Sequence, residues 1–531
     1  MHLKKSERWK WSVKDRSEKD IQIPDFISEH NYHIEQEPFG PQGQEPQPPK
    51  MSPVSKKQRN RTYGRVAYMF AAMFLALAGY MIYFNTMKIE EIRSNPNNAK
   101  MEEQKQYVVR GTIYSADGEI LAGTNVNDDG SETRVYPYGN MFAHVVGYTT
   151  NGKSGLEAIY NNDLLSSNAS IMDQVGKENK NEKLRGDSLI LTLDTKLQRA
   201  AFDALGAYRG AVVVMEPDTG RVLAMVSKPD FDPNQMEERW EYLIAEDSGS
   251  PLLNRATQGL YPPGSTFKIL TTLEYMREHP ADYMNYTYNC EGVIQKDDVS
   301  IPCFGGAVHG LEDLKTSFQQ SCNTSFSNIG LGLDNDKFAA LCEELLFNKE
   351  LPTVMPYSSS QFSLNKNSSY GEMMQTAIGQ GNTLVSPFHM ALITCAIAND
   401  GQLMYPYLVE RTENAKGVKV NSTEPIRYRR LLSVQEAKVL QEYMQSVVEG
   451  GTASSLWGRG YTAAAKTGSA EYQINGNTGE EEVLSTHSWF VGYSNVEDPD
   501  IVVSVIAEDG GTGSSAAVPI AQAIFDAYYY N

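Results

Sequence analysis

The feature that most constrains this chain is an uncharged apolar run close to its N-terminal end. Val66–Phe84, with the sequence VAYMFAAMFLALAGYMIYF, contains 19 residues without a charge or a proline. A helix of this length is about 28 Å long, which is close to the ~30 Å thickness of the hydrocarbon core of a bilayer. The run therefore predicts one transmembrane helix. A helix buried in a protein core is the weaker alternative, because such helices usually keep a polar stripe.

Charges on either side of this run predict its orientation. Residues 1–65 carry 13 Lys and Arg against 9 Asp and Glu, whereas the whole chain of 531 residues carries 47 against 66. The positive-inside bias predicts a single-pass protein of the cytoplasmic membrane, with a cytoplasmic N-terminus and an acidic extracytoplasmic part. A cleaved signal peptide is the alternative, but its apolar run does not normally follow such a long leader. The net charge of −19 argues against a nucleic-acid partner.

The rest of the chain divides into four segments by composition and pattern. Residues 1–65 are rich in Pro, Gln, Glu and Lys, which predicts a disordered cytoplasmic tail, and residues 85–106 form a polar stalk. Residues 107–207 predict a small β-rich pedestal domain, with a hairpin that turns at Asp117 and Gly118. Residues 208–531 have strand patterns at both ends and helical patterns between them. This order predicts an α+β domain with one sheet completed by distant segments.

Cysteine and histidine are few in this chain. Five cysteines are too few for a disulfide scaffold, and eight histidines show neither HExxH nor a Cys/His cluster at zinc spacing, so we expect no structural metal and no cofactor. Cys290 and Cys303 have twelve residues between them and are candidates for a disulfide outside the membrane. Free thiols are the alternative, because the count is odd and Cys322 lies inside a motif described below.

A serine and a lysine mark the sharpest local motif. Ser265 and Lys268 occur in YPPGSTFK, where proline and glycine stop the preceding chain and an amphipathic helical pattern follows. Positions i and i+3 share one face of a helix, so we expect Lys268 to lie beside the Ser265 hydroxyl as its base. The helix N-terminus would stabilise an oxyanion. A second S-x-x-K, from Ser363 to Lys366, has no apolar helical face behind it, and we discount it.

A second lysine could tune the first. A lysine acts as a base only when neutral, which requires a pKa about three units below its usual ~10.4. Burial and a nearby positive charge lower a lysine pKa, and Lys466 is the candidate for that charge. Thr467, Gly468 and Ser469 follow it on a predicted strand whose small residues allow a ligand to come close.

The third motif is S-x-N, from Ser321 to Asn323. Its hydroxyl could relay a proton, and its amide could hold a lysine and a substrate carbonyl. S-x-N is common and recurs at Ser166 and Ser363, so alone it indicates little. The S-x-N motif becomes informative because S-x-x-K, S-x-N and K-T-G follow one another in this order along the chain.

This ordered set resembles the penicillin-recognising serine transpeptidases, which include the penicillin-binding proteins and the serine β-lactamases. Further segments are similar to class B penicillin-binding proteins, and the short pedestal together with KTGSAEY resembles the PbpA branch of that class. One residue departs from the pattern, since Ser469 stands where Thr is common. The further segments are Arg110–Ile113, Phe142–Tyr148, Gly155–Glu157 with Tyr160, Gly379–Gly381 and Glu449–Ala453.

The resemblance implies a fold and an activity. The fold would be the penicillin-binding transpeptidase fold, an antiparallel sheet flanked by helices plus a helical subdomain. The activity would be the cross-linking of peptidoglycan stem peptides. Ser265 would attack the D-Ala-D-Ala carbonyl, Lys268 would accept its proton, and Ser321 would pass that proton to the leaving amine. Asn323 would hold Lys268 and the substrate amide.

The K-T-G strand would bind the substrate. By the same resemblance Lys466 would supply positive charge, while Thr467 and Ser469, on either side of Gly468, would hold the substrate carboxylate. The backbone N–H groups of Ser265 and Ser469 would form the oxyanion hole. An amine from a second stem peptide would accept the acyl group, and β-lactam antibiotics would trap Ser265. The resemblance also implies a partner, a membrane glycosyltransferase of the RodA/FtsW type.

Rival functions share these motifs. A β-lactamase must hydrolyse its acyl-enzyme, and Glu344–Asn348 resembles its E-x-x-L-N water-activating segment, although packing in an amphipathic helix explains these residues better. A D,D-carboxypeptidase would use water as the acceptor. A penicillin sensor or a non-catalytic cell-wall scaffold is the non-enzymatic alternative.

Overall fold

The computed structural model describes residues 56–84, 105–170, 172–173, 176, 182–474 and 483–530. Residues 1–55 of the predicted tail and 85–104 of the predicted stalk lie outside this range. Helix α1 (Lys56–Tyr83) contains a segment, Tyr63–Tyr83, that is long and apolar enough to cross a membrane. Because the helix already begins at Lys56, the prediction of a disordered tail is wrong for residues 56–65. Lysine, arginine and glutamine in this stretch favour continuation of the helix.

A five-stranded antiparallel sheet forms the centre of the second half of the chain, in the order β17-β18-β19-β7-β8. Strands from the two ends of residues 208–531 therefore meet, which confirms the prediction of a sheet completed by distant segments. Strand β17 lies at the edge of the sheet. The strands are β7 (Gly210–Met215), β8 (Val222–Lys228), β17 (Ala463–Ile474), β18 (Val483–Ser494) and β19 (Val502–Ala507).

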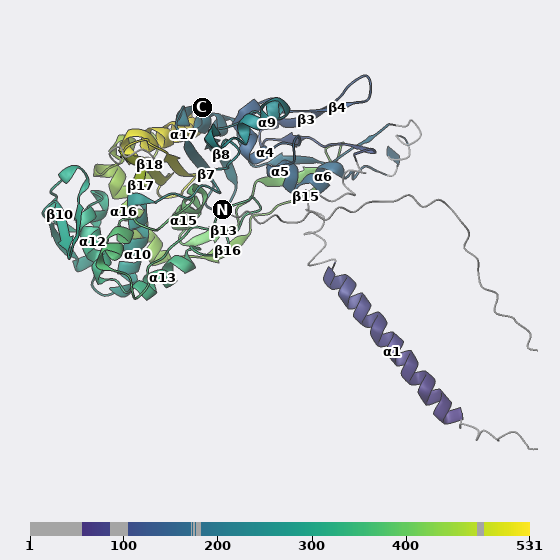
Figure 1. The fold of residues 1–531 in the computed structure, drawn as a ribbon, viewed down its shortest axis with the longest axis horizontal. Coiled ribbons are helices and arrows are strands. Elements are labelled where there is room, and N and C mark those ends of the chain that lie inside the picture. The colour runs from purple at the N-terminus through teal and green to yellow at the C-terminus, as the bar shows by residue number, and fades with distance from the viewer. Residues whose placement is uncertain are drawn as a thin grey trace, which may run out of the picture. The chain divides into compact units, whose positions relative to one another are not determined.

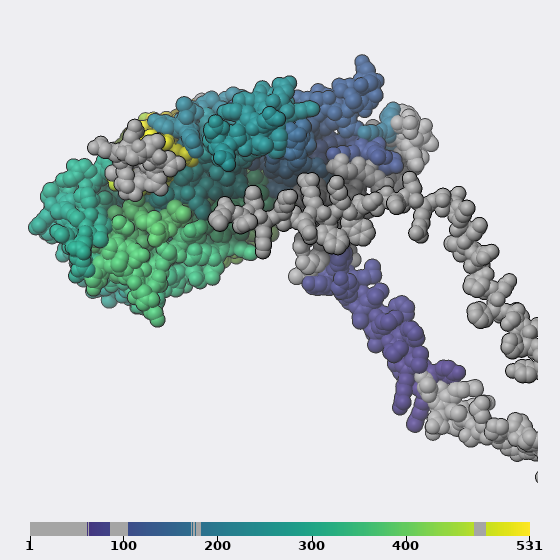
Figure 2. All heavy atoms as spheres, viewed as in Figure 1, coloured from purple at the N-terminus to yellow at the C-terminus, as the bar shows by residue number. Residues whose placement is uncertain are grey.

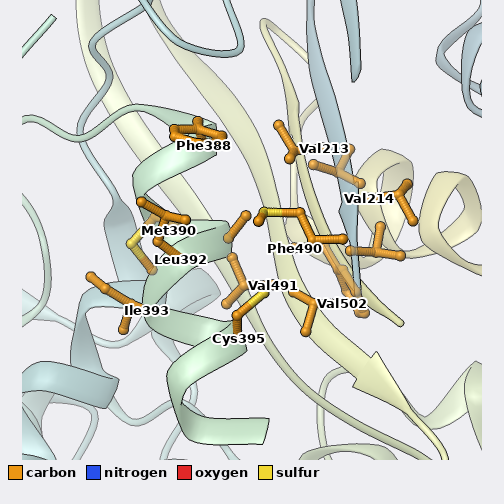
Figure 3. Packing of buried hydrophobic residues seen from close by; sticks show 14 of the residues in the cluster. Val213, Val214, Phe388, Met390, Leu392, Ile393, Cys395, Phe490, Val491 and Val502 are labelled. Carbon is orange, nitrogen blue, oxygen red and sulfur yellow. The ribbon is translucent and has the colours of Figure 1, made fainter. Parts of the chain in front are cut away.

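Helices cover both faces of this sheet. Helix α15 (Pro387–Ala398) is buried over its whole length and packs on β7, β18 and β19. In Figure 3, α15 lies beside the strands that carry Val213, Phe490 and Val502. Helices α8 (Thr195–Leu205) and α17 (Val518–Tyr530) pack against each other and on the sheet. Every residue of β7 and β19 is buried, because a strand covered on both faces needs a continuous apolar run.

A helical subdomain lies beyond the edge strand β17. Its helices lie in the middle of residues 208–531, where the sequence predicts helical patterns. Two small hairpin-like sheets, β9 with β12 and β10 with β11, are attached to it. The elements are α10 (Lys268–Glu278), β9 (Thr287–Cys290), β10 (Val293–Lys296), β11 (Val299–Pro302), β12 (Gly310–Asp313), α11 (Leu314–Gln319), α12 (Asn323–Gly332), α13 (Asn335–Glu344), α14 (Tyr370–Ala377) and α16 (Val434–Gly450).

The pedestal is built on a six-stranded sheet in the order β15-β14-β6-β2-β3-β4. Strands β2 and β3 form the predicted hairpin around Asp117 and Gly118. Strands β14 and β15 come from residues beyond 208, so the two halves of the chain share this sheet. Its strands are β2 (Ile113–Tyr114), β3 (Ile120–Val126), β4 (Glu132–Val135), β6 (Ser188–Leu191), β14 (Val409–Glu413) and β15 (Lys419–Ser422).

The remaining α-helices and strands are short. They are β1 (Val108–Val109), α4 (Ala143–Val146), α5 (Gly155–Ile159), α6 (Asn161–Leu165), β5 (Leu184–Arg185), α9 (Met236–Leu243), β13 (Gln402–Met404) and β16 (Arg427–Arg430). Within the folded part, strands β3 and β4 lie at one end, and β10 and α12 lie at the other (Figure 1). Pedestal residues (blue) and residues of the helical subdomain (green) correspondingly occupy different regions of the surface in Figure 2.

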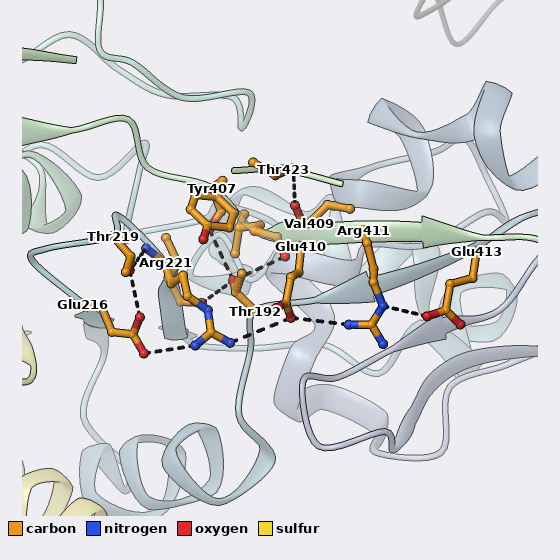
Figure 4. A network of polar contacts seen from close by, with 12 residues as sticks. Thr192, Glu216, Thr219, Arg221, Tyr407, Val409, Glu410, Arg411, Glu413 and Thr423 are labelled. Atoms are coloured by element: carbon orange, nitrogen blue, oxygen red, sulfur yellow. Dashed lines mark hydrogen bonds and ion pairs between the residues drawn. The ribbon is translucent and has the colours of Figure 1, made fainter. Parts of the chain in front are cut away.

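Ion pairs reinforce the place where β14 joins the pedestal (Figure 4). Arg221 lies 3.1 Å from Glu216 and 3.9 Å from Glu410, measured between charged side-chain atoms. Arg411 continues the chain of charges, since its Nε donates to Glu413 Oε1 at 2.6 Å. These side chains are partly exposed, so each pair adds at most about 1 kcal/mol. The shared strands and their backbone ladder carry more of the connection.

A buried acid holds the pedestal together. Glu157 is fully buried and accepts from Arg110 Nε at 2.5 Å and from Arg134 Nε at 2.7 Å. Asn161 and Tyr136 complete the group, since Asn161 Oδ1 accepts from Arg110 and the Tyr136 hydroxyl donates to Glu157. Burial alone would raise the pKa of Glu157, but the two guanidinium groups hold that pKa below its usual value. Glu157 therefore stays charged at neutral pH.

Candidate active site

All three sequence motifs meet at one cavity of about 860 Å³. The cavity lies where η5 (Gly264–Phe267), the turn before α12 and the edge strand β17 come together. The predicted site residues on its wall are Ser265, Ser321, Asn323, Thr467, Gly468 and Ser469. Lys268 and Lys466 lie just behind the wall and are fully buried.

Glycine allows the Ser265 turn to approach the edge strand. Gly264 has φ +53°, and a Cβ there would lie 2.8 Å from the backbone oxygen of Ser469. The Gly264 N–H donates to Gly379 O at 2.9 Å, and a Cβ on Gly379 would clash with the Gly264 oxygen. Ser265 is thereby placed at the start of a short 3₁₀ turn that leads directly into α10. Among the described residues, no hydrogen bond engages its hydroxyl, which is half-buried at the cavity.

Lys268 is held by the S-x-N turn. Its Nζ donates to Ser321 O at 2.7 Å and to Asn323 Oδ1 at 2.8 Å, and lies 3.3 Å from Ser321 Oγ. The ammonium group also lies 5.3 Å from the centre of the Phe326 ring. The structure thus brings together Lys268 and Asn323 as expected. These contacts orient the amine beside the Ser265 turn.

The Ser321 hydroxyl lies between two amines. Lys466 Nζ donates to Ser321 Oγ at 2.9 Å and to the backbone oxygen of Thr467 at 3.2 Å. With Lys268 at 3.3 Å on its other side, Ser321 forms a bridge between the two lysines. Ser321 adopts φ +57°, a left-handed conformation that is strained for a residue with a Cβ. Such strain persists only where the surrounding contacts hold the turn in place.

Burial sets the charge of both lysines. It lowers the pKa of Lys268 to about 7, against a smaller opposing effect of nearby Cys322, Cys303 and Glu312. Burial, and then the charge of Lys268, hold the pKa of Lys466 well below its usual range. Burial therefore works against the positive charge expected on Lys466. An amine without access to water loses more from desolvation than its polar contacts return.

The rest of the K-T-G strand faces the cavity. Thr467 Oγ1 lies 2.6 Å from Thr452 Oγ1, and the Ser469 hydroxyl accepts from Gly513 N at 3.2 Å. A Cβ on Gly468 would come within 3.0 Å of Pro263 O, so glycine allows the serine turn to pass close to β17. These two hydroxyls lie on β17, the edge strand of the sheet, and can donate hydrogen bonds to a ligand that carries a carboxylate.

Some cavity residues were missed by sequence reasoning. Thr512, Gly513 and Ser514 line the cavity from the segment after β19. The run GGTGSS, six small residues after a predicted strand, could have indicated a close backbone approach, because a Cβ on Gly513 would lie 2.7 Å from Thr467 Cβ. Gln380, in the family-like Gly379–Gly381 segment, also lines it.

The competing motifs do not reach this cavity. Ser363 and Lys366 are exposed in the connection between α13 and α14. Glu344 ends α13 and pairs with Arg277 at 2.7 Å on the surface, and Phe347 is fully buried in the core. Neither segment lies among the residues that line the cavity. Packing therefore accounts for the Glu344–Asn348 segment, as the sequence had indicated.

Comparison with known proteins decides the family. Residues 210–526 match the model of the penicillin-binding protein transpeptidase domain, which is more than half of the chain. This chain belongs to the penicillin-binding protein transpeptidase family. In addition, residues 110–189 match the dimerisation domain of penicillin-binding protein A. The predicted fold is therefore confirmed, and this penicillin-binding protein is one whose pedestal is similar to that of the PbpA branch.

Its relatives support the same assignment over most of their length. A peptidoglycan D,D-transpeptidase PbpA of Mycolicibacterium smegmatis is 30% identical over 490 residues, which cover 87% of this chain and 98% of the relative. The structure is similar to penicillin-binding protein A from M. tuberculosis in a ceftriaxone acyl-enzyme complex, with a TM-score of 0.72 and 26% identity. The match covers 81% of this chain and 100% of that one. The structure is also similar to a D,D-transpeptidase domain from Eggerthella lenta, with a TM-score of 0.70 and 32% identity. This match covers 79% of this chain and 97% of that one.

The five cysteines of this penicillin-binding protein are all described and all free. Of the two alternatives for Cys290 and Cys303, a disulfide or free thiols, the structure has free thiols, with the two Sγ atoms 3.7 Å apart. The sequence shows no Cys/His cluster at zinc spacing, but the fold brings such a cluster together. Cys290, Cys303, Cys322 and His309 converge beside the S-x-N turn. Sequence reasoning missed them because 13 positions separate the first two and 19 separate Cys303 from Cys322.

Proposed function

We propose that this penicillin-binding protein is a peptidoglycan D,D-transpeptidase that works through an acyl-enzyme on Ser265. The single observation that carries the proposal is that Ser265 and Ser321 line one cavity while Lys268, whose pKa burial lowers to about 7, contacts the Ser321 hydroxyl from behind the cavity wall. A serine beside a neutral amine is the arrangement that nucleophilic acyl transfer needs. The names of the relatives support the same class of reaction.

In the first half of the reaction Ser265 becomes acylated. Its Oγ attacks the carbonyl carbon between the two D-Ala residues of a stem peptide, and its proton passes to neutral Lys268. The resulting oxyanion accepts hydrogen bonds from the backbone N–H groups of Ser265 and Ser469. When the C–N bond breaks, the proton travels from Lys268 through the Ser321 hydroxyl to the leaving amine, and D-Ala departs. The 3.3 Å separation of Lys268 Nζ and Ser321 Oγ supports this relay.

In the second half an amine from another stem peptide attacks the acyl carbon. The proton of this amine passes to neutral Lys268 as the new C–N bond forms. The C–O bond to Ser265 then breaks, Lys268 returns the proton to Ser265 Oγ, and a peptide cross-link is formed.

Before acylation, Thr467 and Ser469 bind the terminal carboxylate of the donor. That carboxylate would raise the pKa of nearby Lys466 and so favour its charged form.

We further propose that α1 anchors the chain in the cytoplasmic membrane, with the N-terminus inside and the catalytic domain outside. The basic flank of α1 supports this orientation. Residues 107–207 would serve as the pedestal and 208–531 as the transpeptidase domain. A RodA/FtsW-type glycosyltransferase would supply the glycan strands that this chain cross-links.

The test uses the full chain in detergent and a fluorescent penicillin. We expect one label per chain, carried by the peptide that contains Ser265 and retained for many enzyme turnovers. With a D-Ala-D-Ala stem peptide and a D-amino acid as acceptor, the exchanged peptide should form with release of D-Ala. Rapid loss of the label would indicate a β-lactamase instead. Release of D-Ala with only hydrolysed peptide would indicate a carboxypeptidase, and stable labelling without turnover a penicillin sensor.

Acylation should depend on pH through Lys268. Its pKa of about 7 in the folded protein means that the neutral, basic form increases as pH rises through 7. Between pH 6 and pH 8 the neutral fraction, and with it the acylation rate, should rise about tenfold. Stopped-flow labelling across this range measures the effect, with the reactivity of the penicillin towards a small thiol as the control. A flat profile would remove Lys268 as the base.

A further inference from the structure

A compact group of sulfur and nitrogen atoms lies beside the S-x-N turn. It contains Cys290 at the end of β9, Cys303 after β11, His309 before β12 and Cys322 within the motif. One ligand atom from each residue lies within 4.8 Å of the other three. The three thiols are buried. The proposed reaction uses none of these side chains.

The distances within the group are those of tetrahedral metal ligands. The Sγ atoms of Cys303 and Cys290, and those of Cys303 and Cys322, lie 3.7 Å apart. His309 Nδ1 lies 3.3 Å from Cys290 Sγ and 3.7 Å from Cys303 Sγ. A tetrahedral zinc with Zn–S of ~2.3 Å and Zn–N of ~2.0 Å separates two sulfurs by ~3.8 Å and sulfur from nitrogen by ~3.5 Å. A disulfide would instead require ~2.05 Å.

Hydrogen-bond donors surround the sulfurs. The buried Thr324 hydroxyl donates to Cys290 Sγ at 3.1 Å and lies 3.3 Å from Cys322 Sγ. The Ser325 N–H donates to Cys322 Sγ at 3.4 Å. Donors that point at sulfur stabilise thiolates, and metal-bound thiolates usually have such partners. The group therefore has an outer layer as well as four ligand atoms.

We propose that Cys290, Cys303, His309 and Cys322 bind one zinc ion. Three thiolates and one imidazole are soft and borderline ligands, which exclude Mg²⁺ and Ca²⁺ and suit Zn²⁺. Four protein ligands complete a tetrahedron, so the site is structural and leaves no position for substrate. Cys303 and His309 also line the active-site cavity, which gives the ion a path from solvent.

The ion holds the catalytic turn in place. Its ligands join β9 and the connection between β11 and β12 to a turn whose Ser321 is strained at φ +57°. Cys322 lies between the two motif residues that contact Lys268. Fixing its sulfur therefore fixes the position of the proton relay. Oxidation of Cys290 with Cys303 to a disulfide, by an extracytoplasmic oxidant, would remove two ligands and is the competing state.

Metal content tests the site directly. The full chain is purified in detergent without a polyhistidine tag, and zinc is measured by mass spectrometry against protein concentration. We expect about one zinc per chain, and at least a tenfold lower content in Cys303→Ser and His309→Ala. Cys395→Ala is the matched control, because Cys395 is a buried thiol outside the group. Unchanged zinc in both ligand variants would overturn the proposal.

Two further readouts test the ligand set and the competing disulfide. Replacing zinc with cobalt should give the intense absorption of tetrahedral thiolate ligation in the wild type and in Cys395→Ala, but not in the ligand variants. The proposed site would be overturned if the wild-type chain bound neither zinc, added as zinc chloride, nor cobalt, and carried a Cys290–Cys303 disulfide. Both measurements are independent of the proposed transpeptidase function.

The positioning role has its own measurement, which rests on the proposed function. Removing zinc with a chelator should slow penicillin acylation about tenfold, and zinc but not magnesium should restore it. If the metal binds and acylation is unchanged, the positioning role is wrong. If the metal binds and no acylation occurs with zinc present, the proposed function fails and the metal site stands.

Discussion

Replacing Ser265 with alanine is expected to abolish covalent labelling by penicillin, with a fall in acylation rate of about 10⁶-fold. Removal of the nucleophile from an acyl-transfer enzyme has an effect of this size, because the remaining groups only bind and polarise the carbonyl. The Ser265 hydroxyl contributes no hydrogen bond to the described fold, so the variant should keep the thermal stability of the wild type. Labelling is followed by in-gel fluorescence and by the intact mass of the chain.

The chain supplies its own control for this experiment. Ser363 begins the other S-x-x-K motif and is exposed in a connection, away from the cavity. Ser363→Ala should therefore label at the wild-type rate. Persistent labelling of Ser265→Ala, or loss of labelling in Ser363→Ala, would contradict the assignment of the nucleophile.

Replacing Glu157 with glutamine should destabilise the pedestal by about 3–5 kcal/mol. Removing one partner from a buried ion pair leaves an uncompensated buried charge, and here two arginines, Arg110 and Arg134, lose their acid. The glutamine amide would also place a donor against guanidinium donors. Differential scanning calorimetry should show that the pedestal unfolds at a temperature several degrees lower than in the wild type, or that its unfolding transition is absent.

The effect of Glu157 should depend on pH with a defined sign. The pKa of Glu157 is lower in the folded protein than in the unfolded chain, where it is ~4.3. The carboxylate therefore contributes fully to the free energy of unfolding above pH ~4.3, and this contribution is lost as pH falls through the pKa of the folded protein. The difference in free energy of unfolding between the wild type and Glu157→Gln should therefore become smaller below about pH 4. Glu132→Gln is the control, since Glu132 pairs with half-exposed Lys183 and should change stability by less than about 1 kcal/mol. Equal effects of the two variants would contradict the network.

Several elements could be predicted because their signals are local. The apolar run that forms α1 contains no charge over 19 residues, and the strands β7 and β8 flank a turn, Pro217–Gly220, whose residues favour that conformation. The site residues could be named because three short motifs occur in a recognisable order. Their roles came from the resemblance to a family, since spacing along the chain does not show which side chains meet.

Other features depend on contacts between distant segments. Strands β14 and β15 join the pedestal sheet although they lie more than 200 residues after β6. The pKa of Lys466 is lowered because the fold removes water around it, and no property of the K-T-G motif contains that information. Helix α1 extends to Lys56 because charged residues of high helix propensity continue an apolar helix.

The sequence by itself predicted an apolar helix long enough to span a membrane, the α+β architecture and the candidate site residues, because these follow from local composition, periodicity and motif order. Only the tertiary structure decided that Ser321 lies between two buried lysines, and that three cysteines and His309 meet beside it. The physical reason is that pKa values and metal ligation depend on distances of a few ångströms between residues far apart in the chain. Burial and convergence of side chains arise only when the chain is folded.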